Sequence, residues 1–217
     1  MSTTEPVRRT DPGRILAVVL FTCLLLLNAA HLAQDDPLSS PLSTVVTVLT
    51  MAFYVLLVWA YLRRTPTDRT DRRWTSWVVA FAGTAAPFAI PLVSDGLVTA
   101  TLRESLAAVV LGVGLAAMLW ALGALGTNIS VVPQAREVVT HGPYARVRHP
   151  LYAAELLNVV GLCLGHAGPW PWVVLVALVV LQVMRARREE ALLAAELPGY
   201  AEYRSRTPML VPALGRS

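Results

Sequence analysis

The stretch GLCLGHAGPWPWVVLV, residues 161–176, joins two apolar runs through a short segment rich in Gly and Pro. The first run covers residues 151–165 and the second covers residues 170–184. Because the Gly and Pro residues of HAGPWP mark a tight turn, the two runs are predicted to form a helical hairpin. Each run extends about 22 Å at 1.5 Å per residue, which is shorter than the roughly 30 Å hydrocarbon core of a bilayer. The hairpin therefore either crosses the membrane with its polar ends protruding or stops short of the far face.

Four further apolar stretches precede the hairpin, and each has the length of about 20 residues that a spanning helix needs. They cover residues 15–33, 42–62, 74–93 and 105–125. Apolar side chains make up 55% of the chain and charged ones 15%, and the mean hydropathy of +0.56 lies outside the usual range of soluble domains. The predicted fold is all-α: a polytopic membrane helix bundle with a C-terminal helical hairpin. Residues 1–125 are predicted to form an N-terminal transmembrane region, and residues 126–217 a C-terminal region that contains the hairpin.

The arginines indicate the orientation of this bundle. All 18 basic residues are Arg, and a hairpin that crosses twice would place 17 of them on one side, leaving only Arg103 on the other. Since cytoplasmic loops are enriched in Lys and Arg, we expect a multi-pass protein of the plasma membrane with both termini and the functional residues in the cytoplasm. A signal peptide beginning at Arg8 and Arg9 is the alternative interpretation of the first segment, and its long apolar core argues against that.

A polar segment, THGPYARVRHPLY at residues 140–152, lies directly before the hairpin on the predicted cytoplasmic side. Pro150 suits the first turn of a helix, where its missing N–H costs nothing. His149 is therefore predicted to be held at the mouth of the first hairpin helix.

The first arm of the hairpin carries polar residues at steps of three: Tyr152, Glu155 and Asn158. Residues at this spacing are predicted to form one polar stripe on an otherwise apolar helix. A carboxylate inside a membrane segment is costly and indicates a functional residue. The alternative is a Glu near the interface that snorkels or bonds to a neighbouring helix.

The second arm returns another polar group to the same membrane face. It leads into the segment MRARREEALLAAELPGYAEYRSRTP, residues 184–208, and this segment carries Arg185, Glu189 and Glu190 close to its first residue. Ordinary anchoring by arginines and Arg–Glu pairs along a helix would also explain these residues. With His149 across the hairpin, they predict a polar pocket that faces the cytoplasm and has access from the lipid.

These two segments together resemble the isoprenylcysteine carboxyl methyltransferase family and its prokaryotic relatives. The similarity extends over roughly residues 120–212, and the preceding part matches only as generic membrane helices. One departure is Ala154, where a Gly is usual. The matching residues are His141-Gly142-Pro143-Tyr144, Arg148-His149-Pro150 with Tyr152, Glu189-Glu190 with Leu193, Tyr200, Tyr203, Arg206 and Pro208.

The resemblance implies an S-adenosylmethionine-dependent methyltransferase with its cofactor in a cytosol-facing pocket and a lipid-like or small-molecule acceptor that enters between membrane helices. The predicted catalytic residues are Arg185 and Glu190. The predicted cofactor-binding residues are His141, Gly142, Pro143, Tyr144, Arg148, His149, Pro150, Tyr152 and Glu189. The predicted substrate-binding residues are Glu155, Asn158, Tyr200 and Tyr203.

Several points stay open at the level of sequence. The cofactor's ammonium or sulfonium is expected beside Glu189 or Glu190, and the pattern does not decide which. The acceptor is also open, from an isoprenylated cysteine carboxylate to small thiols, amines and lipid headgroups, as is the oligomeric state. No metal-ligand spacing or nucleic-acid motif is evident in the sequence. The alternatives are a NADPH-dependent membrane reductase of the sterol reductase type, which also carries an RHP element, and a non-enzymatic membrane protein that retains the fold.

Overall fold

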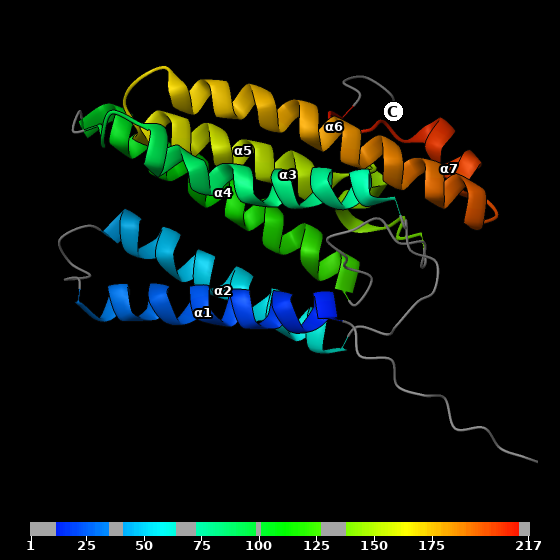
Figure 1. Ribbon diagram of the computed structural model, residues 1–217, viewed down its shortest axis with the longest axis horizontal. Coiled ribbons are helices and arrows are strands. Elements are labelled where there is room, and N and C mark those ends of the chain that lie inside the picture. Colours follow the sequence, from blue (N-terminus) through cyan, green and yellow to red (C-terminus); the bar gives the residue numbers. More distant parts are fainter. Residues whose placement is uncertain (1–11, 35–40, 64–72, 99–100, 127–137, 213–217) are drawn as a thin grey trace, which may run out of the picture.

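The protein, described from a computed structural model, is a bundle of long helices that run alternately up and down (Figure 1). The structure describes residues 12–34, 41–63, 73–98, 101–126 and 138–212. The helices are α1 Pro12–Gln34, α2 Pro41–Arg63, α3 Trp74–Val93, α4 Thr101–Leu125, α5 Pro150–Gly165, α6 Trp170–Glu196 and α7 Tyr200–Arg206, with a 3-10 turn η2 at Gly142–Ala145. Within these described ranges the only extended pairing is an isolated bridge between Leu97 and His166. The predicted all-α membrane bundle with a C-terminal hairpin is confirmed.

Four of the described helices are long and apolar enough to cross a membrane. These spans are Thr44–Arg63, Trp74–Val93, Leu102–Leu125 and Trp170–Glu196. Helix α5 is shorter, with 16 residues, which corresponds to about 24 Å. The first helix contributes a further short apolar stretch, Ala17–Ala30.

Helix α6 continues well past the apolar run that ends at residue 184. The added segment RARREEALLAAE consists of strong helix formers, so the helix persists after the apolar side chains stop. It ends at Glu196 because Leu197 precedes Pro198 and adopts extended backbone angles, φ −120° and ψ 115°. The charged end of α6 thereby projects beyond α5 and brings its polar residues to the segment before α5.

The most extensive helix contact joins α4 to α5. Two glycines allow this close approach. A Cβ atom added to Gly161 would lie 2.7 Å from Leu111 Cγ, and one added to Gly114 would lie 2.8 Å from Asn158 Cγ. The α4–α5 pair is therefore the centre of the bundle, against which α2 and α6 pack.

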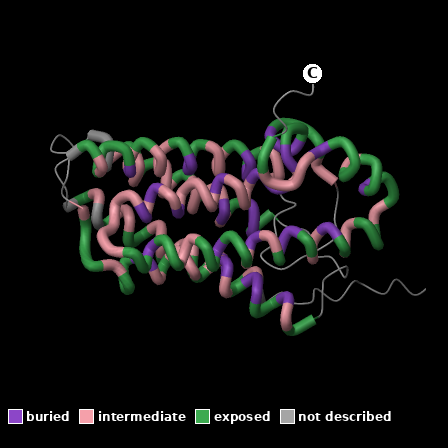
Figure 2. Tube along the Cα trace, turned by 90° about the horizontal axis from the view of Figure 1, so that it is seen from above, coloured by how far each residue is buried: buried purple, intermediate pink, exposed green. Residues whose placement is uncertain are grey.

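The remaining helices attach to this centre in two groups. Helices α1 and α2 pack together and join the bundle through α2 and α4, whereas α3 packs mainly against α6. Buried residues follow these contacts, as Figure 2 shows in purple. One buried group comprises Ala17, Leu57, Ala60, Tyr61 and Leu122, and the other comprises Ile90, Val159, Cys163 and Leu178.

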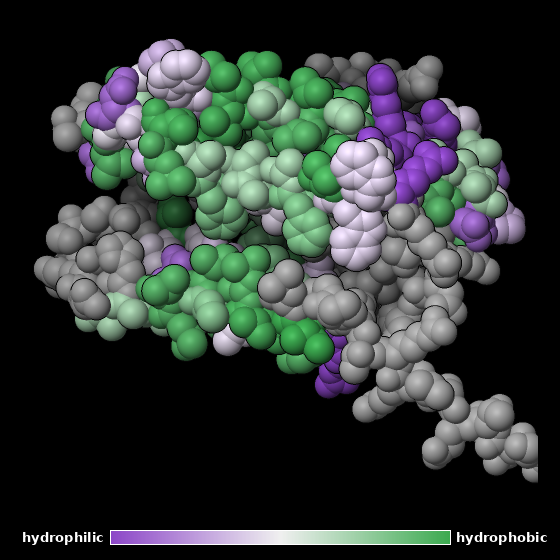
Figure 3. Space-filling view, in the orientation of Figure 1, coloured by the Kyte–Doolittle hydropathy of each residue, from purple (hydrophilic) through white to green (hydrophobic). Residues whose placement is uncertain are grey.

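One end of the bundle is polar. Helices α3 and α5 begin there and helices α4 and α6 end there, with α7 beside them (Figure 1). Figure 3 shows apolar side chains along the bundle and a concentration of hydrophilic ones at this end. Part of the arginine pattern lies outside the described residues, namely Arg8, Arg9, Arg64, Arg69, Arg72, Arg136 and Arg216.

Candidate active site

The polar segment before α5 is held by the part of the chain that follows α7. The backbone N–H of Arg148 donates to the carbonyl of Pro208 at 2.8 Å, and that of His149 donates to the carbonyl of Met209 at 3.0 Å. Pro150 is the first residue of α5, as predicted, and His149 is its N-cap. These contacts fix the imidazole at the mouth of the helix.

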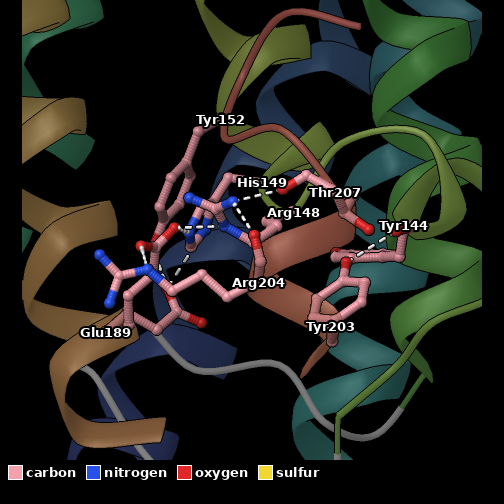
Figure 4. Close-up of polar contacts among 9 residues, drawn as sticks. Tyr144, Arg148, His149, Tyr152, Glu189, Tyr203, Arg204 and Thr207 are labelled. Atoms are coloured by element: carbon pink, nitrogen blue, oxygen red, sulfur yellow. Dashed lines mark hydrogen bonds and ion pairs between the residues drawn. The ribbon is translucent and has the colours of Figure 1, made fainter. Parts of the chain in front are cut away.

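The side chain of Arg148 joins three segments of the chain (Figure 4). Its Nε donates to Glu190 Oε1 on α6 at 2.7 Å, and its Nη1 donates to the carbonyl of Arg204 on α7 at 3.0 Å. The same Nη1 donates to the carbonyl of Thr207. A guanidinium supplies five donors in a rigid plane, and Arg148 uses them to fasten the polar segment to α6 and α7.

Glu190 is the buried carboxylate of this group, with a side chain that is 2% exposed. Besides its contact with Arg148, Oε1 lies 3.1 Å from His149 Nε2, and Oε2 lies 3.4 Å from Arg204 Nε. Removing the partners of a buried charge is strongly destabilising. The residue predicted to be catalytic thus has both carboxylate oxygens engaged by basic side chains of the protein itself.

Glu189 contacts different neighbours and stays partly open, with a side chain that is 31% exposed. Its Oε2 accepts a hydrogen bond from the Tyr152 hydroxyl at 2.9 Å and lies 3.8 Å from His149 Nδ1. Among the described residues, no side chain donates to its Oε1. We refer to Arg148, His149, Glu189 and Glu190 as the outer cluster, in which Glu189 is the carboxylate with room for a further partner.

Tyr152 connects the outer cluster with the interior of the bundle. Its ring lies parallel to the His149 imidazole, with 5.3 Å between ring centroids and 2° between planes. The guanidinium carbon of Arg185 lies 4.8 Å from the centroid of the same phenol ring. A cation over an aromatic face is attracted by the ring quadrupole, so the phenol ring links two residues predicted for different roles.

A second polar group, the inner cluster, lies between α5 and α6 and consists of Glu155, Gln182 and Arg185. Arg185 Nη1 donates to Gln182 Oε1 at 3.1 Å, and Gln182 Nε2 donates to Glu155 Oε2 at 2.5 Å. Gln182 is fully buried and Arg185 is buried. The structure therefore brings together a predicted substrate-binding residue and a predicted catalytic residue through an intervening amide.

Three tyrosines lie beside the outer cluster. The Tyr203 hydroxyl donates to the Tyr144 carbonyl at 2.7 Å. Burial raises the pKa of Tyr203 to about 12, although the nearby Arg148 lowers it, so the phenol keeps its proton at neutral pH and remains a donor. Burial is also the main cause that raises the pKa of Tyr200, with a smaller contribution from Glu190. The structure places Tyr200 and Tyr203, which are both predicted to bind substrate, on α7 and apart from the inner cluster.

Asn158 points to another side of the bundle. Its amide nitrogen donates to Met118 Sδ at 2.7 Å and to the Ala154 carbonyl at 3.2 Å, so it faces α4. Each step of three residues turns about 300° around a helix, so two steps from Tyr152 rotate Asn158 by about 120°. The expected stripe therefore splits between α6 and α4.

The HGPY element is divided between surface and interior. His141 and Gly142 are exposed, and Gly142 has a left-handed φ of 61° at the start of η2. Pro143 and Tyr144 are buried. The structure thus places one half of this predicted cofactor-binding element where solvent reaches it and the other half in the packing.

Two contributors to the inner cluster were not predicted from the sequence. Gln182 did give a signal, because it is a polar residue inside an apolar run and precedes Arg185 by three positions, which places both on one helix face. Gly83 on α3 gave no such signal in the sequence. A Cβ atom there would lie 3.1 Å from Arg185 Cδ, so the absence of a side chain makes room for the arginine.

Residues 102–197 match the phospholipid methyltransferase family. The matched part is less than half of the chain and runs from α4 to just beyond α6, so it contains the inner and outer clusters. This family is related to the isoprenylcysteine carboxyl methyltransferase-like membrane methyltransferases, and the resemblance found in the sequence is confirmed.

Two curated proteins are similar to slightly less than half of the chain. The cobalt-zinc-cadmium resistance protein CzcN of Cupriavidus metallidurans is 31% identical over a 115-residue alignment that covers 48% of this chain and 53% of that protein. The nickel-cobalt-cadmium resistance protein NccN of Alcaligenes xylosoxydans xylosoxydans is 29% identical over a 112-residue alignment that covers 46% of this chain and 53% of that protein. The chain thus spans about half the length of the curated relatives it matches.

Proposed function

We propose that this protein is an integral membrane methyltransferase that transfers a methyl group from S-adenosylmethionine to a lipophilic or small acceptor. One observation carries this proposal: side-chain contacts run without a break from the outer cluster, through Tyr152, to the inner cluster. This path joins the polar end of the bundle to a position between apolar helices. Such a connection suits a reaction between a water-soluble methyl donor and an acceptor dissolved in lipid.

The outer cluster has the chemistry to hold the cofactor. S-adenosylmethionine carries an ammonium and a sulfonium, and the partly exposed Glu189 retains a carboxylate oxygen for one of them. His149 and Tyr152 supply aromatic surface beside this position, and Pro143 and Tyr144 are proposed to line the same pocket. When bound, the cofactor supplies a methyl group that is already activated, so the protein has to orient the reactants and balance charge.

The two glutamates are proposed to have different roles. The contacts favour Glu189 as the carboxylate that meets the cofactor, because Glu190 is already engaged by Arg148, His149 and Arg204. Glu190 then acts by holding the polar segment, α6 and α7 in register. This assignment replaces the initial expectation of a catalytic role for Glu190.

The inner cluster is proposed to receive the acceptor. Arg185 presents a planar guanidinium that suits a carboxylate or a phosphate, and Glu155 provides an opposite charge nearby. Holding an acceptor atom in line with the methyl group accounts for a large part of catalysis in such transfers. We propose that residues 1–125, which match the family over their last part alone, determine which acceptor reaches this position.

The polar end of the bundle is proposed to face the cytoplasm, in the plasma membrane. The sequence assigns 17 arginines to this side of the membrane, and they support that orientation. S-adenosylmethionine is then available where the outer cluster lies.

The proposal is tested by calorimetry on the detergent-solubilised protein with S-adenosylmethionine and with NADPH. We expect binding of S-adenosylmethionine and no binding of NADPH. A second measurement follows transfer of labelled methyl into lipid extracts by the protein in vesicles. Binding of NADPH alone would favour a reductase, and binding of neither compound would favour a non-enzymatic role.

A further inference from the structure

Gln182 occupies an unusual position for an uncharged polar residue. It lies on α6 inside an apolar run, its side chain is fully buried, and both ends of its amide are bonded to charged residues. The NH₂ end donates to Glu155 on α5, and the carbonyl end accepts from Arg185 one turn further along α6.

The direction of this amide is determined by its neighbours. A carboxylate only accepts hydrogen bonds and a guanidinium only donates them. Reversing the amide would therefore place its NH₂ group against donors and its carbonyl against acceptors. Gln182 has one satisfied orientation, and in that orientation it sets the separation of the two charged groups.

Arg185 is confined from three directions. The Gln182 side-chain oxygen accepts a hydrogen bond from Nη1 of the arginine, and the Tyr152 ring centroid lies 4.8 Å from the guanidinium carbon. Gly83 leaves the space that the arginine side chain fills. A Cβ atom at Gly83 would lie 3.1 Å from Cδ and 3.3 Å from Nη1 of this arginine. Removing either the amide or this space shifts the guanidinium without changing its charge.

We infer that Gln182 is a positioning residue for the acceptor: it ties Glu155 to Arg185 so that the two charges are presented to the acceptor in one fixed arrangement. This inference rests on the proposed function. It does not require Gln182 to touch the acceptor. The distance between Glu155 and Arg185 then determines how the acceptor is aligned for the reaction. A displacement of about 1 Å in such an alignment can reduce activity by about 100-fold.

Three variants probe this arrangement. Gln182→Met keeps the length of the side chain and removes both hydrogen bonds, whereas Gln182→Glu retains an acceptor for Arg185 and sets a second carboxylate against Glu155. Gly83→Ala displaces Arg185 by a different route and leaves the amide unchanged. Leu178→Met is the packing control for α6, because Leu178 is also fully buried and lies one turn earlier. Gly123→Ala is the control for Gly83→Ala, because no atom lies within 4 Å of a Cβ at Gly123.

The measurement is methyl transfer from labelled S-adenosylmethionine by protein in vesicles of phosphatidylethanolamine and phosphatidylglycerol, with N-acetyl-S-farnesylcysteine as a second acceptor probe. We expect the three variants to lose about 10- to 100-fold in kcat/KM for the acceptor. The KM for S-adenosylmethionine should stay near the wild-type value and both controls should remain active, whereas the thermal midpoint of Gln182→Met should fall because two buried charged groups lose a hydrogen-bond partner. A merely structural role would instead lower the active fraction and leave the acceptor KM unchanged.

The outcomes separate this inference from the function on which it rests. If the wild type transfers methyl groups and Gln182→Met and Gly83→Ala have its acceptor KM and kcat, the inference is wrong and the proposed function stands. If Gln182→Met fails to fold, Gly83→Ala decides by the same comparison. If the wild type methylates neither probe and binds no S-adenosylmethionine, the proposed function falls and this inference falls with it.

Discussion

The phenol ring of Tyr152 and the guanidinium of Arg185 meet across the α5–α6 hairpin, with 4.8 Å between the guanidinium carbon and the ring centroid. The two residues belong to segments that are separate in the sequence, and each makes its hydrogen bond to a different carboxylate or amide on α6. Their contact makes one polar path out of two clusters. It also separates two contributions of Tyr152 that mutation can test, its ring and its hydroxyl.

Tyr152→Phe should leave the acceptor side of the site intact and weaken the cofactor side. The ring would still support Arg185, whereas Glu189 would lose its hydrogen bond from the hydroxyl. A hydrogen bond to a charged group contributes about 1.5–3 kcal/mol, so we expect affinity for S-adenosylmethionine to fall by about 10-fold or more. Calorimetry together with the acceptor KM checks this, with Tyr152→Leu as the variant that should impair both sides. Unchanged cofactor affinity in Tyr152→Phe would remove the hydroxyl from the cofactor side.

Arg185→Lys should cost activity although it keeps the positive charge. An ammonium does not reproduce the planar fork of a guanidinium, so the side chain can neither hold Gln182 nor orient an acidic acceptor in the same way. We expect kcat/KM for the acceptor to fall by about 10- to 100-fold and the affinity for S-adenosylmethionine to stay within about twofold, as outer-cluster contacts are not touched. A fully active variant would mean that the planar fork of Arg185 is not needed for the reaction.

Glu189→Gln should weaken cofactor binding and leave stability unchanged, whereas Glu190→Gln should lower stability. Glu190 is 2% exposed and pairs with Arg148, whose side chain is 10% exposed, so removing the glutamate charge leaves a largely buried cation without a counter-charge, a change that typically costs about 3–5 kcal/mol. We expect a lower thermal midpoint for Glu190→Gln. Glu189→Gln should unfold near the wild-type temperature and bind S-adenosylmethionine at least about 10-fold more weakly, because the missing charge is the one proposed to meet the cofactor.

Thermal unfolding and calorimetry on the two variants, prepared side by side, make this comparison. Glu202→Gln is a suitable control, because Glu202 pairs with Arg206 on an exposed surface, where an ion pair contributes little. Weak cofactor binding by Glu190→Gln with an unchanged midpoint would reverse the two assignments.

The sequence predicted the helices well because apolar runs in a membrane protein report length directly. The start of α5 followed from Pro150, and the hairpin turn followed from the Gly and Pro residues between the runs. The end of α6 was not predicted from the apolar run, because that run stops at residue 184. Helix propensity and the Leu197-Pro198 step determine where the helix ends. Charged, helix-forming continuations of a membrane helix are therefore easily cut short when only apolar runs are measured.

The sequence predicted which polar residues lie together at one end of the hairpin but not their contacts with one another, and their roles stay predictions. His149, Tyr152, Glu155, Arg185, Glu189 and Glu190 do gather at one end of the hairpin. The direction of Asn158 was missed, since steps of three residues drift around a helix. Arg204 and Thr207 each receive a hydrogen bond from Arg148 at a backbone carbonyl, and no side-chain pattern reveals a carbonyl.

Accessibility labelling should separate the two ends of the bundle. In a variant without Cys23 and Cys163, we would introduce Leu97→Cys in the α3–α4 connection and Ser205→Cys on α7. Both native residues are exposed in the structure. If the arginine-rich end is cytoplasmic, a membrane-impermeant thiol reagent added to intact cells should label only the Leu97→Cys protein. Equal labelling of both would overturn the proposed orientation.

Gly161→Ala should destabilise the α4–α5 centre of the bundle more than its single methyl group suggests. The added Cβ would lie 2.7 Å from Leu111 Cγ and 3.0 Å from the Leu111 backbone nitrogen. The backbone atom cannot swing aside as a side chain does, so the helices must separate, and overpacking of this kind costs about 1–3 kcal/mol. Gly112→Ala is the matched control, because a Cβ there meets nothing within 4 Å. Since alanine favours a helix over glycine by about 0.5–1 kcal/mol, the control should raise the thermal midpoint slightly while Gly161→Ala lowers it. Equal midpoints for the two variants would show that α4 and α5 are less closely packed than their glycines indicate.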